Sequence, residues 1–143
     1  MRPKGLILWA WLLVAFTPVL AQQPPGRDPV GENLFPPELV MSHQQAIGLD
    51  DAQKTFIRSE LLKTQSRFME LQWQLQDAME TLAALLKQNP ADEAQVMAQL
   101  DKVLSFEREI KRTQLGLMVR IKNKLTPEQQ ARLQEIRQKA MQR

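Results

Sequence analysis

The chain has 143 residues, no cysteine, one histidine and a formal net charge of +3. The lack of cysteine excludes a disulfide-stapled scaffold and a thiol enzyme, so a small domain of this kind must be held together by packing alone. With one histidine and no glycine-rich phosphate loop, no nucleophile, base and orienting group can be assembled, and we expect neither an enzyme nor a bound cofactor.

The first 21 residues are typical of a secretory signal peptide. A short basic start precedes an apolar run from Leu6 to Leu20, and Ala21 is the small residue that cleavage requires. The run is shorter than the roughly 20 residues that span a bilayer, although an uncleaved anchor has a similar pattern. We expect export, followed by cleavage after Ala21.

Cleavage would leave 122 residues (143 less 21), which fits one small domain. Its charge is uneven, because residues 22–101 hold 6 basic and 12 acidic side chains whereas residues 102–143 hold 11 and 4. Antiparallel helices drawn from these halves would attract each other, and this attraction is the simpler explanation of the uneven charge. The basic end alone gives little support for nucleic-acid binding, and no nucleic-acid partner is expected.

Residues 22–36 contain four prolines and two glycines and are predicted to form a flexible leader. Pro36-Pro37 favours a helix start, so a short helix is predicted over residues 37–47, with Gly48 as the residue that ends it. The helical domain is therefore expected to cover residues 37–143.

Two long helices are predicted next, over residues 51–88 and 90–124. Asp50 and Gln53 can form a capping box at the start of the first helix, because the carboxylate accepts from a free amide and the glutamine reaches back. Asn89-Pro90 is expected to end this helix and to begin the second, with Asn89 as the N-cap residue.

Both long helices carry an apolar stripe in steps of three and four residues. If they pair antiparallel about residue 89, the numbers of facing residues should sum to about 178. The first stripe comprises Ile57, Leu61, Thr64, Phe68, Leu71, Leu75, Ala78, Leu82 and Leu85, and the second comprises Val96, Leu100, Val103, Glu107, Ile110, Gln114, Leu117 and Ile121. Thr64 then faces Gln114 as a polar pair that fixes the register, whereas Glu107 opposite Leu71 does not fit.

A fourth helix follows, with Thr126 as its N-cap residue, Pro127 in its first position and Gln129 closing a second capping box. After the hairpin returns, this helix lies beside the start of the first long helix. The predicted fold class is all-α: a long antiparallel helical hairpin with short N- and C-terminal helices hooked over its open end.

Two segments share one pattern, Leu49-Asp50-Asp51-Ala52-Gln53 and Leu125-Thr126-Pro127-Glu128-Gln129. They resemble the two LTxxQ motifs of the Spy/CpxP family of periplasmic proteins, over about residues 37–140. Asp50 stands where that family has threonine, a change that keeps the capping chemistry. One such motif alone is a common helix start, but two copies at these places are much more specific.

The resemblance implies a periplasmic hooked hairpin that dimerises into a curved cradle. It also implies an ATP-independent chaperone or a stress-response adaptor, whose partners are unfolded or misfolded exported proteins and a membrane sensor protein. The related CnrX and ZraP proteins imply the alternative, a periplasmic heavy-metal sensor or resistance protein that acts on a membrane signalling partner.

The long helices carry more apolar residues than one seam can bury. The proposed client or dimer surface comprises Met69, Trp73, Phe106 and Met118, with Arg112 and Arg120 as charge contacts. A homodimer interface is the simpler explanation, and a client-binding surface is the functional one, since methionine repacks against varied partners. Trp73 lies about 200° around the helix from Leu71, so it points away from the seam.

His43 is the only histidine, with Met41 nearby. Zinc prefers four ligands and copper(I) would need more thioethers, so one imidazole makes an incomplete metal site. We interpret His43 as a polar residue on a short helix, and the alternative is a site that two chains complete together.

Overall fold

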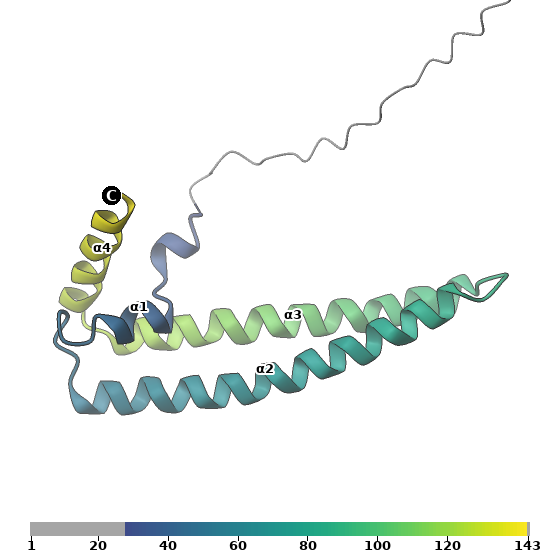
Figure 1. The fold of residues 1–143 in the computed structure, drawn as a ribbon, viewed down its shortest axis with the longest axis horizontal. Coiled ribbons are helices and arrows are strands. Elements are labelled where there is room, and N and C mark those ends of the chain that lie inside the picture. The colour runs from purple at the N-terminus through teal and green to yellow at the C-terminus, as the bar shows by residue number, and fades with distance from the viewer. Residues whose placement is uncertain (1–27, 143) are drawn as a thin grey trace, which may run out of the picture.

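The computed structural model describes residues 28–142, and every regular element within them is a helix. In chain order these are the 3-10 turn η1 (Gly31–Asn33) and the helices α1 (Pro37–Ser42), α2 (Asp51–Leu86), α3 (Glu93–Lys124) and α4 (Pro127–Met141). Helices α2 and α3 run side by side as a long hairpin, and α1 and α4 lie at the end away from the α2–α3 turn (Figure 1). The predicted all-helical hairpin is confirmed, while the predicted signal peptide lies outside the described residues.

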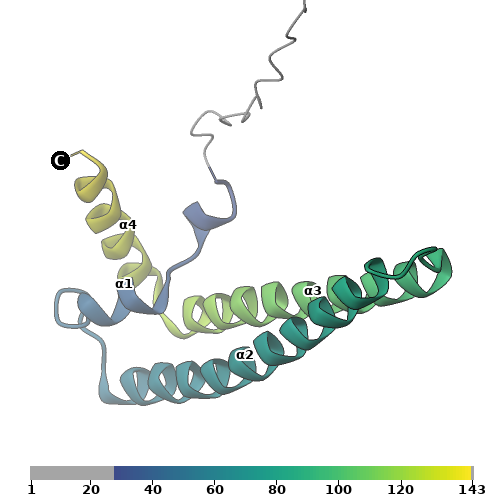
Figure 2. The same cartoon turned by 45° about the vertical axis from the view of Figure 1, so that its right-hand side comes forward.

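The hydrophobic core lies at this hooked end. Figure 2 shows α4 rising away from the hairpin, with α1 close to its base. The core cluster draws on the helices α1 to α4, on the segments that join them and on the segment before α1; it comprises Phe35, Val40, Ile47, Leu49, Ile57, Leu117, Ile121, Leu125 and Leu133. Side chains at the hooked end therefore pack against several elements at once, which a layer of only two helices does not allow.

The packed domain begins before Pro37. Within the segment that the sequence predicted to be a flexible leader, Leu34 and Phe35 are buried in the described structure. Arg137 of α4 holds this segment in place, because its guanidinium donates to the carbonyls of Glu32, at 3.0 Å, and of Leu34. The guanidinium carbon also lies 5.4 Å from the centre of the Phe35 ring.

Helix α1 is shorter than predicted and ends at Ser42 instead of residue 47. The Leu39 carbonyl accepts hydrogen bonds from the Ser42 hydroxyl, at 3.1 Å, and from Nδ1 of His43, at 2.9 Å. These side chains occupy the carbonyl that a continuing helix would offer to the His43 amide, so the helix gives way to turns.

Gly48 nevertheless has the role predicted for it. Its φ of +66° is the left-handed conformation that favours glycine. The Gly48 amide donates to the Gln45 carbonyl and the Leu49 amide donates to the Gln44 carbonyl, which is the Schellman pattern that ends a helical turn. The chain is thereby redirected into the first long helix.

Helix α3 begins three residues later than predicted. Its N-cap residue is Asp92, whose carboxylate accepts from the Gln95 amide at 3.1 Å, and Pro90 lies in the preceding turn. The hydrogen bond from the Gln95 backbone, followed by one from the Gln95 side chain, lowers the pKa of Asp92. The prediction of Asn89 as the N-cap residue is wrong, because a carboxylate was available closer to the apolar stripe.

The predicted register is close to the observed one. Three side chains link the two hairpin helices: Gln99 to the Ala78 carbonyl at 2.8 Å, Gln53 to the Lys124 carbonyl at 2.9 Å, and Arg120 to Glu60 at 2.6 Å. The paired residue numbers sum to 177, 177 and 180, against a predicted value of about 178. Pairing about the turn therefore follows from the spacing of the stripes.

The predicted stripe of α3 is wrong by one residue in its middle. Glu107 and Gln114 are exposed, whereas Phe106 is half-buried and Gln99 is buried. The predicted polar pair is therefore not buried as a pair, and Thr64 is buried without an equally buried Gln114. A straight helix drifts relative to a seven-residue repeat, so the seam moves to the preceding residue; a sum of 177 places Phe106 opposite Leu71, where Glu107 had not fitted.

Candidate functional site

Both predicted capping boxes are present. Oδ1 of Asp50 accepts from the Gln53 amide at 2.7 Å, and Oε1 of Gln53 accepts from the Asp50 amide at 3.1 Å. Thr126 and Gln129 repeat this arrangement at 3.2 and 2.9 Å. Each motif therefore satisfies amides that would otherwise be unpaired at the start of α2 or α4.

The two motifs also bind each other, which sequence reasoning did not anticipate. Nε2 of Gln53 donates to Oε1 of Gln129 at 2.8 Å, and Nε2 of Gln129 donates to Oε1 of Gln53 at 2.9 Å. Nε2 of Gln53 also donates to the Lys124 carbonyl, and Nε2 of Gln129 also donates to the Gly48 carbonyl. Both buried amides thus use their full hydrogen-bonding capacity, and the pair fastens the hook to the hairpin.

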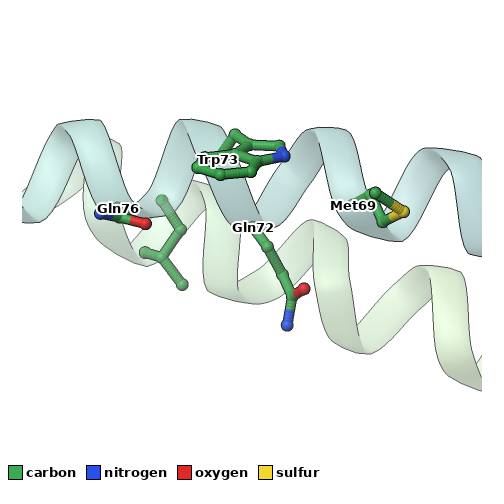
Figure 3. A pocket seen from close by; sticks show the side chains of 5 residues that line it. Met69, Gln72, Trp73 and Gln76 are labelled. Carbon is green, nitrogen blue, oxygen red and sulfur yellow. The ribbon is translucent and has the colours of Figure 1, made fainter.

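This glutamine junction is structural, whereas the exposed apolar residues lie farther along the hairpin. On α2, 63% of the Trp73 surface and 58% of the Met69 surface are exposed, while Leu71 between them is buried. A shallow hollow beside the indole is lined by Met69, Gln72, Trp73, Leu75 and Gln76 (Figure 3). We call these five residues the α2 strip, and its exposed indole agrees with the predicted direction of Trp73.

Helix α3 carries a second hollow, at a similar level along the hairpin. It is lined by Leu104, Glu107, Arg108, Lys111, Arg112 and Leu115, which we call the α3 strip. Half of the Leu104 surface is exposed. Arg112 forms one ion pair on its own helix, to Glu109 at 3.6 Å. The strip therefore combines exposed leucines with an excess of positive charge.

The remaining predicted surface residues are placed differently. Phe106 and Met118 are half-buried, so each offers only part of its surface. Arg120 is bound to Glu60 across the hairpin, and Glu60 also accepts from Lys63 at 3.1 Å. The hydrogen bond from Lys63, followed by that from Arg120, lowers the pKa of Glu60. Of the predicted set, Met69, Trp73, Arg112 and Arg120 are exposed, and Arg120 is paired with Glu60.

His43 is half-buried at the hooked end, on a hollow that Leu39, Ile136 and Met141 also line. Nδ1 of His43 lies 2.9 Å from both the Leu39 carbonyl oxygen and the Ser42 hydroxyl oxygen. Within residues 28–142, no three histidine, cysteine, aspartate or glutamate side chains are grouped so that they could hold a metal. The described part of one protomer therefore does not fit a metal centre.

Among the helices of residues 28–142, none is both long and apolar enough to cross a membrane.

A family model described as heavy-metal resistance matches residues 6–132, which is most of the chain. No curated protein and no solved structure matches the chain.

Proposed function

The chain belongs to the heavy-metal resistance family, and on that premise we propose that it is a periplasmic, ATP-independent chaperone or stress-response adaptor for unfolded exported proteins. The observation that carries the proposal is the exposure of Trp73 and Met69 on the side of α2 that faces away from the seam. A tryptophan exposed in this way is atypical of a protomer surface that contacts only water.

The α2 and α3 strips supply complementary parts of such a binding surface. Methionine and tryptophan in the α2 strip offer apolar area that adapts to varied partners. Arg108, Lys111 and Arg112 in the α3 strip attract acidic segments and raise the rate of encounter. The mechanism is transient coverage of apolar client segments, and it needs neither a nucleotide nor a catalytic residue.

A second copy of the chain is the further partner that we propose. The exposed apolar residues extend toward the hairpin turn and include Met79, Leu86 and Met97. One protomer does not cover them, whereas an isologous dimer would bury part of this surface and leave the remainder for clients. Sedimentation of the purified chain tests this assembly.

Aggregation of a chemically denatured client, followed by light scattering in the presence of the purified chain, tests the proposed activity. We expect suppression near a stoichiometric ratio without ATP, and the same suppression with zinc or with a chelator. Unchanged aggregation under both conditions would contradict the chaperone proposal. Suppression that requires zinc would favour the second candidate.

That second candidate is a heavy-metal sensor or resistance protein that acts on a membrane signalling partner. The family match supports it, and His43, half-buried on a hollow at the hooked end, would supply one imidazole ligand. The missing ligands would come from a second protomer. Titration with zinc, nickel and copper decides between the candidates, because micromolar binding that His43→Ala abolishes is expected only for the sensor.

A further inference from the structure

A third apolar hollow lies where the chain enters α1 and crosses the hairpin. It is lined by Pro36, Pro37, Glu38, Leu61, Thr64, Gln65, Phe68, Gln114, Leu117 and Met118 and has a volume of about 380 Å³. We call it the entry groove. The start of α1 supplies one wall, while α2 and α3 supply the floor, so three segments distant in sequence build it.

The floor of the entry groove is apolar and only partly covered. Leu61, Phe68 and Met118 are half-buried, and Leu117 beneath them is buried. The volume is within the range of small-ligand sites and accepts a side chain as large as leucine or phenylalanine. Burial of such a side chain supplies the apolar part of the binding free energy.

The rim of the groove has polar groups suited to a peptide backbone. Gln65 and Gln114 are exposed, and neither side-chain amide has a partner within residues 28–142. Each amide carries donors and an acceptor, so the pair can bond the alternating N–H and C=O groups of an extended chain. A lipid tail or a purely apolar ligand would leave both amides unused.

One charged residue lines the groove, and it is acidic. Glu38 is exposed on the wall, whereas the α3 strip presents Arg108, Lys111 and Arg112. The two surfaces therefore favour ligands of opposite charge. A groove with an apolar floor, amides on its rim and one carboxylate selects a basic residue beside an apolar anchor.

We propose that the entry groove is a docking site for a short extended segment of a partner protein, in which an aromatic or aliphatic anchor adjoins a lysine or arginine. This site is separate from the α2 and α3 strips and adds sequence selectivity to the broad client binding proposed above. The anchor occupies the floor between Leu61, Phe68 and Met118, and the basic residue lies against Glu38.

Fluorescence anisotropy with labelled ten-residue peptides and the full chain tests this site. The probe has Phe-Lys at the centre of a Gly/Ser sequence, and matched peptides carry Ala-Lys or Phe-Glu. We expect the Phe-Lys peptide to bind about tenfold tighter than the Ala-Lys peptide, because alanine buries much less apolar surface in the groove than phenylalanine does. We expect it to bind about threefold tighter than Phe-Glu, as for a solvent-exposed charge contact.

Glu38→Lys is the decisive variant, because it should reverse the order of the Phe-Lys and Phe-Glu peptides without removing the anchor site. Glu128→Lys is the matched control, since Glu128 also follows a proline at the start of a helix but lies outside the groove. We expect Glu128→Lys to keep the preference for Phe-Lys. Glu38→Lys is expected to gain affinity for the Phe-Glu peptide, and a variant that merely fails to fold cannot show such a gain.

Equal affinity for the three peptides, or the same response to Glu38→Lys and Glu128→Lys, would overturn the proposal. So would peptide binding that falls as self-association rises in sedimentation, because a second copy would then occupy the groove. Loss of peptide selectivity in a chain that still suppresses client aggregation would overturn only the docking site and leave the proposed chaperone function intact.

Discussion

The two ends of the hairpin differ in how they are held together. The hooked end contains the nine-residue core cluster, with Ile57, Ile121 and Leu133 fully buried. In the turn end, which we define as residues 69–110, four residues are buried: Leu71, Ala78, Gln99 and Val103. The same helices thus pass from a multi-sided core into a two-helix layer, in which each helix can bury only one stripe.

Under the proposed function, this difference separates the residues that stabilise the fold from those that bind a partner. At the hooked end, apolar side chains contact α1, α4 and the entry segment, so their burial stabilises the protomer. Toward the turn end, no further element within residues 28–142 covers the outer side of α2, and Trp73 and Met69 remain exposed. Substitutions at the two ends should therefore have opposite consequences for folding and for binding.

The largest effect on stability is expected at Leu133. Leu133→Ala removes a fully buried side chain from the core cluster and should lower the free energy of unfolding by about 3 kcal/mol. Leu82→Ala, at a half-buried position of the turn end, should cost about 1 kcal/mol. Urea unfolding followed by circular dichroism measures both, and equal losses would remove the contrast between the ends.

The glutamine junction gives the next largest effect. Gln53→Leu removes one of the two partners of each polar atom in the Gln129 side-chain amide and the side-chain donor to the Lys124 carbonyl, at a cost of about 2 kcal/mol. Gln99→Leu breaks one bond to the Ala78 carbonyl and should cost about 1 kcal/mol. Combining Gln53→Leu with Gln129→Leu should cost clearly less than the two single losses added together; simple additivity would show that the side chains act independently.

A smaller effect is expected at Glu60, which bridges α2 and α3. Because its pKa is lowered from the ordinary value of 4.5, chiefly by Lys63 and then by Arg120, the carboxylate stabilises the fold above that pH. The stabilisation is lost as the pH falls through the lowered pKa of the folded state. Glu60→Gln should therefore be slightly less stable than the wild type at pH 7, and the two should converge in acid.

Salt offers the control for this ion pair. The partners of Glu60, Lys63 and Arg120, are exposed, so 1 M salt should shrink the difference between Glu60→Gln and the wild type at pH 7. A difference that persists unchanged at low pH and in high salt would mean that the side chain stabilises the fold by packing and not by charge.

Local signals in the sequence predicted most of the fold. The capping residues Asp50 and Thr126 are correctly placed, because their chemistry depends on positions three residues away. The register was predicted because a short turn forces neighbouring stripes to pair. The error at the start of α3 arose because Asn89 and Asp92 can both cap a helix, and the error in its stripe arose because Phe106 and Glu107 are neighbours and tertiary packing decides between them.

Contacts between distant segments were not predictable in this way. Nothing in the spacing of Gln53 and Gln129 shows that their side chains meet, although their identical positions in two motifs offered a signal. The clamp of Arg137 on Leu34 joins residues 103 positions apart, and proline-rich composition pointed instead to a flexible leader. The exposure of Trp73 was predictable, since helix periodicity alone sets the side on which it lies.

The central claim is that the exposed residues of the α2 strip serve binding and contribute little to the protomer. The double variant Met69→Ser/Trp73→Ser tests it most directly when unfolding by urea and suppression of client aggregation are measured on the same preparation. We predict a change below about 0.5 kcal/mol in protomer stability, as for surface positions, together with a loss of most of the suppression. A large loss of protomer stability with suppression retained by the folded fraction would contradict the account.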